Sequence, residues 1–219
     1  MEPKKFAVVL AGCGVYDGAE IQEAVLTLLS IDKLGGIYQC FAPDINQYHV
    51  INHLNGNTMN EIRNARVEAA RIARGNVLPL SDFSSTDFDA IVFPGGFGVA
   101  KNLCTFALDG ANCSVNPDAE KAIKKAYAAK LPIGALCIAP ALIARVLGKG
   151  TLTIGTDANT AKALESLGVR HQITEEADVV IDVENKIISS PCYMQDTTIT
   201  VVAEGAENVI RGLFDLMKE

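Results

Sequence analysis

A single cysteine at a strand-to-helix junction is the strongest candidate for chemistry in this sequence. Cys137 follows the short apolar run at residues 132–136 and precedes a second apolar segment at residues 138–147. A tight turn at this junction would expose the thiol beside the N-terminus of a helix, where free N–H groups and the helix dipole lower its pKa. The small residues Gly134 and Ala139 permit such a turn. The alternative is a buried structural thiol, because cysteine is among the most buried residue types.

A glycine pair after another apolar run could supply hydrogen-bond donors to the same site. Residues 94–96 are Pro-Gly-Gly and follow a predicted strand at residues 90–93. Glycine lets a backbone N–H face the site, and the N–H of Gly96 together with that of Ile138 would form an oxyanion hole. Gly95 is a further candidate for substrate binding. The motif is equally compatible with an ordinary turn.

The order of strands and helices predicts the scaffold that positions these residues. Apolar runs typical of buried strands alternate with segments of helical periodicity almost throughout the chain. The expected strands are residues 6–11, 37–42, 90–93, 132–136 and 151–155, with a hairpin of residues 179–183 and 186–189. The expected helices are residues 17–34, 60–74, 97–107, 117–130, 138–147 and 159–167, and a final helix that carries Ile210, Leu213, Phe214 and Met217. This pattern predicts an α/β fold, a flavodoxin-like sandwich whose mostly parallel central sheet is covered by helices on both faces.

The first expected helix, residues 17–34, carries one apolar stripe. Ile21, Val25, Leu28 and Leu29 recur at helical spacing and form it. Such a stripe is typical of an amphipathic helix.

Three segments that each follow a predicted strand are expected to meet at one edge of the sheet. Residues 12–14 (Gly-Cys-Gly) follow the first strand, as residues 94–96 and Cys137 follow later ones. Ligands of such sheets bind beyond the carboxyl ends of the strands, so these segments form one predicted site. With Gly18, residues 12–14 match a dinucleotide fingerprint poorly, because the last glycine comes four residues after the second instead of three. We therefore expect no nicotinamide and no other cofactor.

Composition and charge restrict the class of protein. The chain has 219 residues, 49% hydrophobic and 21% charged, which suits a single domain over residues 1–219 with a polar insertion at about residues 45–60. Its net charge of −7 disfavours nucleic acid as a partner, because binding phosphates needs clustered Lys and Arg. No apolar run is long enough for a membrane helix, and the first one is too short for a signal peptide. We therefore expect a cytoplasmic protein with neither nucleic-acid nor membrane partners.

The six cysteines and three histidines lack the spacing of a disulfide framework or a metal site. No two cysteines form a CxxC pair, which favours reduced thiols in a reducing compartment. His49, His53 and His171 lack the spacing of metal ligands on a helix, so no metal site is expected.

Several of these segments together resemble one known family. The matching segments are residues 12–18, 50–54, 94–98, 101–103 and 137–140. They are similar to the enhancing-lycopene-biosynthesis (ElbB) branch of the PfpI and class I glutamine-amidotransferase-like superfamily, and the similarity covers nearly the whole chain. The resemblance implies a nucleophile elbow at the cysteine. It also brings Gly14 and Asn102, which lie in matching segments, into the set of candidate site residues.

The resemblance implies a glutamate beside the cysteine. Relatives place this residue early in the first helix, where Glu20 and Glu23 are both available. Glu23 lies twelve residues before Gly35, which fits the family spacing better, and Glu20 is the second candidate. A partly buried carboxyl group there can have a raised pKa and share a proton with the sulfur of Cys137. Either glutamate could instead be a solvated first-turn residue that the helix dipole favours.

No histidine of this sequence stands where the superfamily carries a catalytic base. Glutaminases of the superfamily have a late His-x-Glu pair, and residues 189–194 contain no histidine. The residue after Cys137, which is histidine in PfpI-type proteases, is Ile138 here. Some deglycase-like relatives carry a histidine about twenty residues after the cysteine, where this chain has Asp157. Asp157 and His53, which lies in the insertion, are candidates to replace it.

These features favour a cofactor-independent enzyme acting on small reactive dicarbonyls. The resemblance implies a glyoxalase-type lyase of low activity that converts glyoxal to glycolate through Cys137 and Glu23. The first alternative is a non-catalytic thiol redox sensor or binding protein linked to isoprenoid metabolism, with Cys137 as its reactive group. A glutaminase-type amidotransferase is disfavoured by the missing His-x-Glu pair. Relatives often dimerise, so the resemblance also implies a homodimer.

Overall fold

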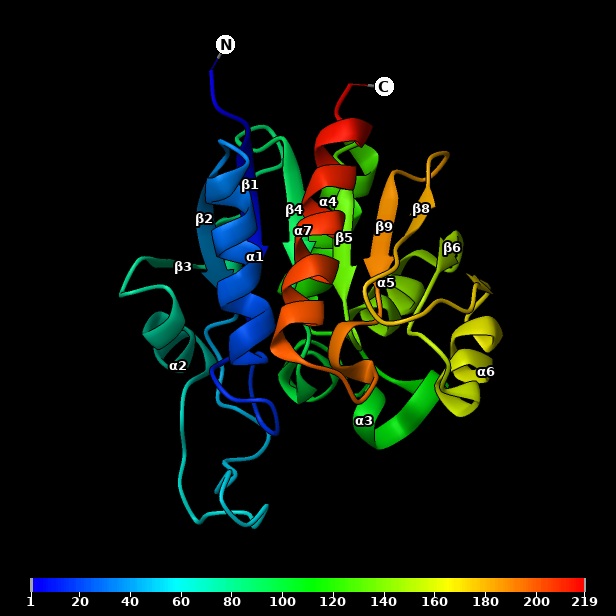
Figure 1. Ribbon diagram of the computed structural model, residues 1–219. Coiled ribbons are helices and arrows are strands. Elements are labelled where there is room, and N and C mark those ends of the chain that lie inside the picture. Colours follow the sequence, from blue (N-terminus) through cyan, green and yellow to red (C-terminus); the bar gives the residue numbers. More distant parts are fainter. Residues whose placement is uncertain (1, 219) are drawn as a thin grey trace.

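Buried apolar strands form a mostly parallel sheet at the centre of the molecule (Figure 1). The computed structural model describes residues 2–218. Its seven-stranded sheet has the order β3-β2-β1-β4-β5-β9-β8, and its strand pairs are parallel except for β8 with β9. The strands are β1 (Lys5–Val9), β2 (Ile37–Ala42), β3 (Val77–Pro79), β4 (Ala90–Phe93), β5 (Ile133–Leu136), β8 (Val180–Asp182) and β9 (Ile187–Ser190). A separate pair consists of β6 (Thr151–Leu152) and β7 (Arg170–His171).

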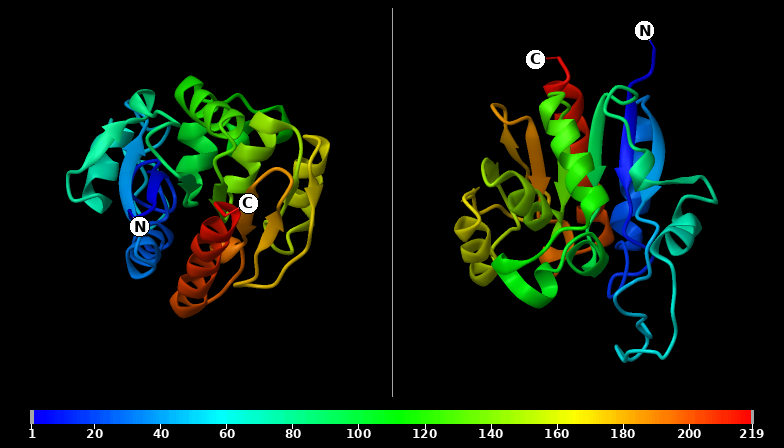
Figure 2. Two further views of the ribbon diagram at one scale, coloured as in Figure 1. Left: turned by 90° about the horizontal axis from the view of Figure 1, so that it is seen from above. Right: turned by 180° about the vertical axis from the view of Figure 1, so that it is seen from behind.

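Helices cover both faces of this sheet, because strand residues alternate between two apolar cores. The helices are α1 (Ile21–Lys33), α2 (Ala65–Ile72), α3 (Phe106–Asp109), α4 (Pro117–Ala128), α5 (Ala139–Leu147), α6 (Ala158–Ser166) and α7 (Ile199–Leu216). Along β1, Phe6 and Val8 pack towards α1 and α7, whereas Ala7 and Val9 pack towards α4 and α5. Figure 2 shows these two layers on opposite sides of the sheet. The predicted α/β sandwich is confirmed.

Residues 97–107, which we predicted to form one helix, are divided into two short pieces. A π-helical turn spans Val99–Leu103, and α3 begins at Phe106. Between them, Cys104 adopts an extended backbone and pairs with Val115 in an isolated antiparallel bridge. This bridge requires a bend that a continuous helix could not make.

The apolar stripe predicted on α1 does not face the sheet. Ile21, Val25 and Leu29 are 44%, 46% and 48% exposed. Of the four stripe residues, Leu28 alone is buried. The inward face consists instead of Glu23, Ala24, Thr27, Leu28, Ser30 and Ile31. In this orientation Ala24, Leu28 and Ile31 pack into the core, and the Glu23 carboxylate accepts a backbone N–H from just beyond the end of β4.

The polar insertion projects from the rest of the molecule as a long loop (Figure 1). It extends over residues 43–64, without a helix or a named strand. Two isolated bridges, Asn46 with Asn64 and Ile51 with Thr58, hold its two sides together. Across residues 2–218, none of the helices combines the length and the apolar character needed to cross a membrane. The same residues contain no group of three His, Cys, Asp or Glu side chains that could hold a metal ion.

Candidate active site

Cys137 lies on a sharp turn between β5 and α5. Its φ of 57° falls in the left-handed region, which a non-glycine residue adopts only where surrounding contacts hold it there. The backbone N–H of Cys137 donates to the carbonyl of Ser190 at 3.0 Å, which ties the turn to the end of β9. The residue is only 7% exposed. The exposed thiol that we predicted is therefore wrong, because the turn directs the sulfur to the floor of a cavity.

Glu23 lies beside this thiol in the first turn of α1 and is fully buried. Its carboxylate accepts two backbone hydrogen bonds, from Gly95 to Oε2 at 2.9 Å and from Tyr193 to Oε1 at 3.1 Å. It also forms a hydrogen bond with the Cys137 thiol. These partners come from three different segments of the chain. The orientation of the carboxyl group is therefore fixed before any ligand binds.

Burial raises the pKa of both groups. The pKa of Glu23 rises to about 8, first because burial disfavours its charged form and then because of the negative charge of Glu20. The pKa of the Cys137 thiol is also raised, by burial and then by Glu23. The lowered pKa that we predicted from the helix terminus is therefore wrong, because burial outweighs the terminus. The pair therefore loses its first proton near pH 8.

Backbone N–H groups of Gly96 and Ile138 flank the sulfur. Both hydrogen-bond the Cys137 thiolate and partly offset the effect of burial on its pKa. An oxygen atom on a carbon bonded to this sulfur would lie within reach of the same donors, which is the arrangement of an oxyanion hole. The N–H of Gly95 is already engaged, because it donates to Glu23. Gly95 therefore positions the carboxyl group and does not face the sulfur with its N–H.

A cavity of about 360 Å³ lies above Cys137. Its walls are mainly apolar and include Phe97, Phe106, Ile138 and Met194. Within the described part of the chain, no lysine, arginine or histidine lines this cavity. The cavity has the size of a small-molecule site, and it offers no cation to bind a carboxylate or phosphate group.

Glu20, the second candidate glutamate, caps α1 and borders the cavity. Its Oε2 accepts the backbone N–H of Glu23 at 2.6 Å, as the side chain of an N-cap residue does. Burial raises the pKa of Glu20. Through its charge, Glu20 in turn raises the pKa of Glu23. Glu20 therefore affects the pair of Cys137 and Glu23 through its contact with Glu23.

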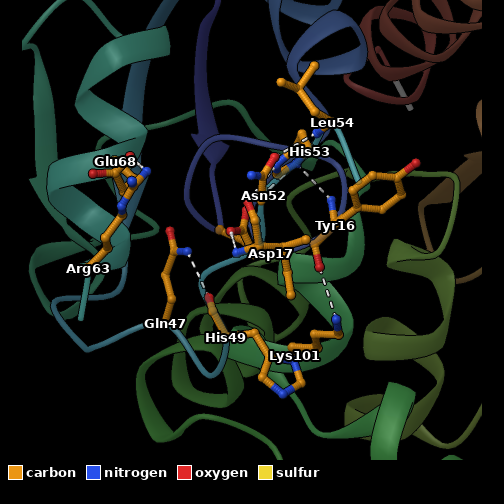
Figure 3. A network of polar contacts seen from close by, with 12 residues as sticks. Tyr16, Asp17, Gln47, His49, Asn52, His53, Leu54, Arg63, Glu68 and Lys101 are labelled. Carbon is orange, nitrogen blue, oxygen red and sulfur yellow. Dashed lines mark hydrogen bonds and ion pairs between the residues drawn. The ribbon is translucent and has the colours of Figure 1, made fainter. Parts of the chain in front are cut away.

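His53 ties the insertion to the first loop (Figure 3). It does not line the cavity. Its Nε2 accepts the N–H of Tyr16 at 3.2 Å, and its Nδ1 lies 3.0 Å from the carbonyl oxygen of Ile51, which assigns the proton to Nδ1. Asp17 reinforces the junction by accepting the N–H of Ile51 at 2.6 Å. Gly14 is required beneath the ring, because a Cβ there would lie 2.6 Å from its atoms. His53 and Gly14 thus join two loops and do not reach the sulfur.

The two remaining candidates also make structural contacts. The amide nitrogen of Asn102 donates to the carbonyls of Ala11 and Asp17, both at 2.9 Å. Its Oδ1 accepts the N–H of Tyr48 at 2.9 Å, so this buried side chain joins the first loop to the insertion. Asp157 is exposed and caps α6, where it accepts a backbone N–H at 2.9 Å. Neither residue lines the cavity or replaces the missing histidine.

The sequence analysis missed two residues of the site. Tyr193 donates its backbone N–H to Glu23, and its hydroxyl hydrogen-bonds Gln22 at the rim of the cavity. Cys192 is buried close to Glu23, whose charge adds to the effect of burial in raising the pKa of this thiol. Both residues directly follow β9 at the carboxyl end of the sheet. Their place just after a predicted strand is the feature of the sequence that could have identified them as site residues.

Relatives of this chain are known both as sequences and as structures. The chain is 41% identical over 222 residues to the human Glutamine amidotransferase-like class 1 domain-containing protein 3, mitochondrial, covering 97% of this chain and 83% of that protein. It is 40% identical to the rat ES1 protein homolog, mitochondrial, covering 97% and 84%. The crystal structure of an isoprenoid biosynthesis protein with amidotransferase-like domain from Ehrlichia chaffeensis matches with a TM-score of 0.92 and 38% identity, over 97% of this chain and 99% of that chain. No family model matches the chain.

A more distant structure shares only the fold. Glyoxalase III from Candida albicans matches with a TM-score of 0.60 at 16% identity, over 95% of this chain and 97% of that chain.

The relatives correct one expectation and establish the family. The human, rat and zebrafish proteins are all named mitochondrial, which contradicts the cytoplasmic location that we expected. Their similarity extends over nearly the whole of the described structure, including the segments that carry Glu23 and Cys137. The chain therefore belongs to the glutamine amidotransferase-like class 1 superfamily, together with the ES1 proteins.

Proposed function

We propose that this protein is a cofactor-independent, glyoxalase-like lyase that converts glyoxal-type dicarbonyls to hydroxy acids. The observation that carries the proposal is the contact between Cys137 and Glu23 on the floor of an apolar cavity. A thiol beside a carboxyl group with a pKa of about 8 can add to an aldehyde and move protons without a histidine. The lining residues include no cation to hold the carboxylate of glutamine, which disfavours a glutaminase.

The first step joins the thiol to an aldehyde carbon of the substrate. The sulfur of Cys137 bonds to that carbon, and the thiol proton passes through Glu23 to the carbonyl oxygen, which gives a hemithioacetal. Negative charge that develops on this oxygen during the addition lies near the N–H groups of Gly96 and Ile138.

Glu23 then transfers a proton between the two substrate carbons. Its carboxylate removes the C–H proton of the hemithioacetal, which gives an enediol, and returns a proton to the neighbouring carbon. The resulting thioester on Cys137 is cleaved by water, so that the C–S bond breaks and the thiol regains its proton. Glyoxal and one water molecule together give glycolic acid, and no net oxidation or reduction takes place.

Steady-state conversion of glyoxal to glycolate tests this proposal. Cys137→Ala is expected to lower the rate by at least roughly 100-fold, because no thioester can form. Cys40→Ala is the matched control, since Cys40 is a buried thiol in β2 that does not line the cavity, and it is expected to keep the wild-type rate. Equal rates for wild type and Cys137→Ala would refute the mechanism.

A second candidate is a thiol-sensing or binding role linked to isoprenoid metabolism. The Ehrlichia relative, described as an isoprenoid biosynthesis protein, favours it, as does the resemblance to the ElbB branch, which we propose as the place of this chain in the superfamily. A sensor would require mild peroxide to modify Cys137 faster than Cys40, with no turnover of glyoxal. That role offers no substrate carbonyl to take the thiol proton, and the raised pKa of Cys137 leaves little of the thiolate, which is the form that is oxidised.

A further inference from the structure

Two thiols that take no part in the site above are held against each other in a neighbouring loop. The bridge between Cys104 and Val115, with a backbone hydrogen bond of 3.0 Å beside it, draws together the ends of residues 105–114. Val115 lies opposite Cys104 in this bridge, and Cys113, which stands two residues before Val115, has an extended backbone (φ −60°, ψ 149°). Alternate residues of an extended segment point to the same side, so Cys113 lies on the same side as Cys104. Both residues are buried, with 3% and 0% exposure. The Cys104 thiol donates to the carbonyl of Val99 at 3.4 Å and also lies within hydrogen-bonding range of the Cys113 thiol.

A cation lies next to one of these two thiols. Arg145 of α5 donates from Nε to the carbonyl of Cys113 at 2.7 Å, and its guanidinium group also hydrogen-bonds the Cys113 thiol. The hydrogen bond from Cys104, and then the charge of Arg145, lower the pKa of Cys113 to about 7. The same hydrogen bond, and then burial, raise the pKa of Cys104. Loss of one proton from the pair is therefore favoured at Cys113, which lies beside Arg145, while Cys104 stays neutral.

No other cysteine of this chain has such an environment. All six cysteines lie within residues 2–218, and Cys113 is the one whose pKa falls. Burial raises the pKa of the other four, which are Cys13, Cys40, Cys137 and Cys192. Because the thiolate is the nucleophile in thiol oxidation, Cys113 is the cysteine best prepared to react with an oxidant.

We propose that Cys104 and Cys113 form a reversible disulfide when the protein meets a hydroperoxide. The Cys113 thiolate attacks one peroxide oxygen, the O–O bond breaks, and a sulfenic acid forms on Cys113 while water or an alcohol leaves. The sulfur of Cys104 then attacks that of Cys113, an S–S bond forms, and a second water leaves with the Cys104 proton. The two thiols together lose two electrons, which the peroxide gains. A dithiol reductant reverses the change by thiol–disulfide exchange.

The disulfide would join the two ends of a segment that forms part of the cavity wall. Phe106 and Ala107, which lie between the two cysteines, line the cavity above Cys137. Closing the loop behind them restricts how far this wall can move. Peroxide reaches the pair when the short turns of residues 105–114, several of whose residues are exposed, open locally. The inference does not depend on the proposed glyoxalase activity.

Mass spectrometry of the full chain under non-reducing conditions tests the proposal. Reduced protein treated with equimolar hydrogen peroxide and then alkylated is expected to give a peptide cross-linked between Cys104 and Cys113, which dithiothreitol removes. Cys40→Ser is the matched control and is expected to form the same cross-link. Arg145→Gln is expected to slow cross-linking at neutral pH by roughly threefold, because the thiolate fraction of Cys113 falls. Stepwise oxidation of Cys113 to the sulfinic acid without a cross-link would overturn the proposal, as would a cross-link confined to other cysteines.

Discussion

Replacing Gly95 with alanine is expected to abolish glyoxal turnover while most of the fold persists. A Cβ at this position would overlap Cβ of Cys137 and lie 2.6 Å from Oε2 of Glu23 and 3.0 Å from the sulfur. Both neighbours are held by backbone contacts, so the added methyl group separates the thiol from the carboxyl group. Displacement of about 1 Å at reacting groups can cost roughly 100-fold in rate, and overpacking costs roughly 1–3 kcal/mol of stability.

Gly36→Ala is the control for Gly95→Ala, because it overpacks the core without disturbing the site. A Cβ there would lie 2.9 Å from the Ile31 side chain and 3.0 Å from Phe6, both of which are core residues that do not line the cavity. This variant is expected to lose stability and to keep its turnover. Rates and thermal unfolding of both variants provide the comparison. Wild-type turnover by Gly95→Ala would show that the contact between Cys137 and Glu23 is not needed.

Raising the pH is expected to destabilise the protein through Glu23. In the unfolded chain this carboxyl group ionises near pH 4.5, whereas in the folded chain its pKa is about 8. The folded state therefore holds a proton that the unfolded state has lost, so its stabilising effect is complete below pH 4.5 and disappears as the pH rises through about 8. The difference between the two pKa values corresponds to on the order of 5 kcal/mol.

Denaturant unfolding of wild type and Glu23→Gln, at about pH 5 and about pH 9, measures this effect. The loss of stability between these pH values is expected to be larger in wild type, because glutamine does not ionise. Because the two proteins share all their other titrating groups, the difference between their losses of stability reports on Glu23 alone. The amide of the variant leaves the N–H of Gly95 or of Tyr193 poorly paired, which lowers its stability at both pH values by about 1–3 kcal/mol. Equal losses in the two proteins would show that Glu23 ionises normally in the folded state.

The sequence was sufficient to predict those features that depend on order along the chain. Apolar runs followed by Gly-rich or cysteine-bearing turns predict a parallel sheet, and the carboxyl ends of its strands meet at one edge. The segments that carry Cys137 and Gly96 accordingly lie together. Glu23 was proposed by resemblance to a family, since the helical pattern around it does not distinguish it from Glu20.

What the sequence could not predict depends on how the elements pack. The pKa of Cys137 is raised because the folded chain surrounds the thiol, and a local pattern contains no information on that burial. The inward face of α1 contains a buried carboxylate, and the apolar stripe visible in the sequence does not identify that face. The environment of Cys113 likewise requires Arg145, which lies on a later helix and contacts it only in the folded chain.

The hydrogen bonds that hold Glu23 join residues far apart in the sequence. Gly95 lies 72 positions away and Tyr193 lies 170 positions away. Contacts between residues so far apart in the sequence close long loops of the chain, which costs conformational entropy. We therefore expect these two hydrogen bonds to form after the central strands have paired. During synthesis, the thiol of Cys137 leaves the ribosome well before Tyr193 exists to orient its carboxyl partner. The Glu23 carboxyl group therefore acquires its fixed orientation only when the end of β4 and the segment after β9 have both reached α1.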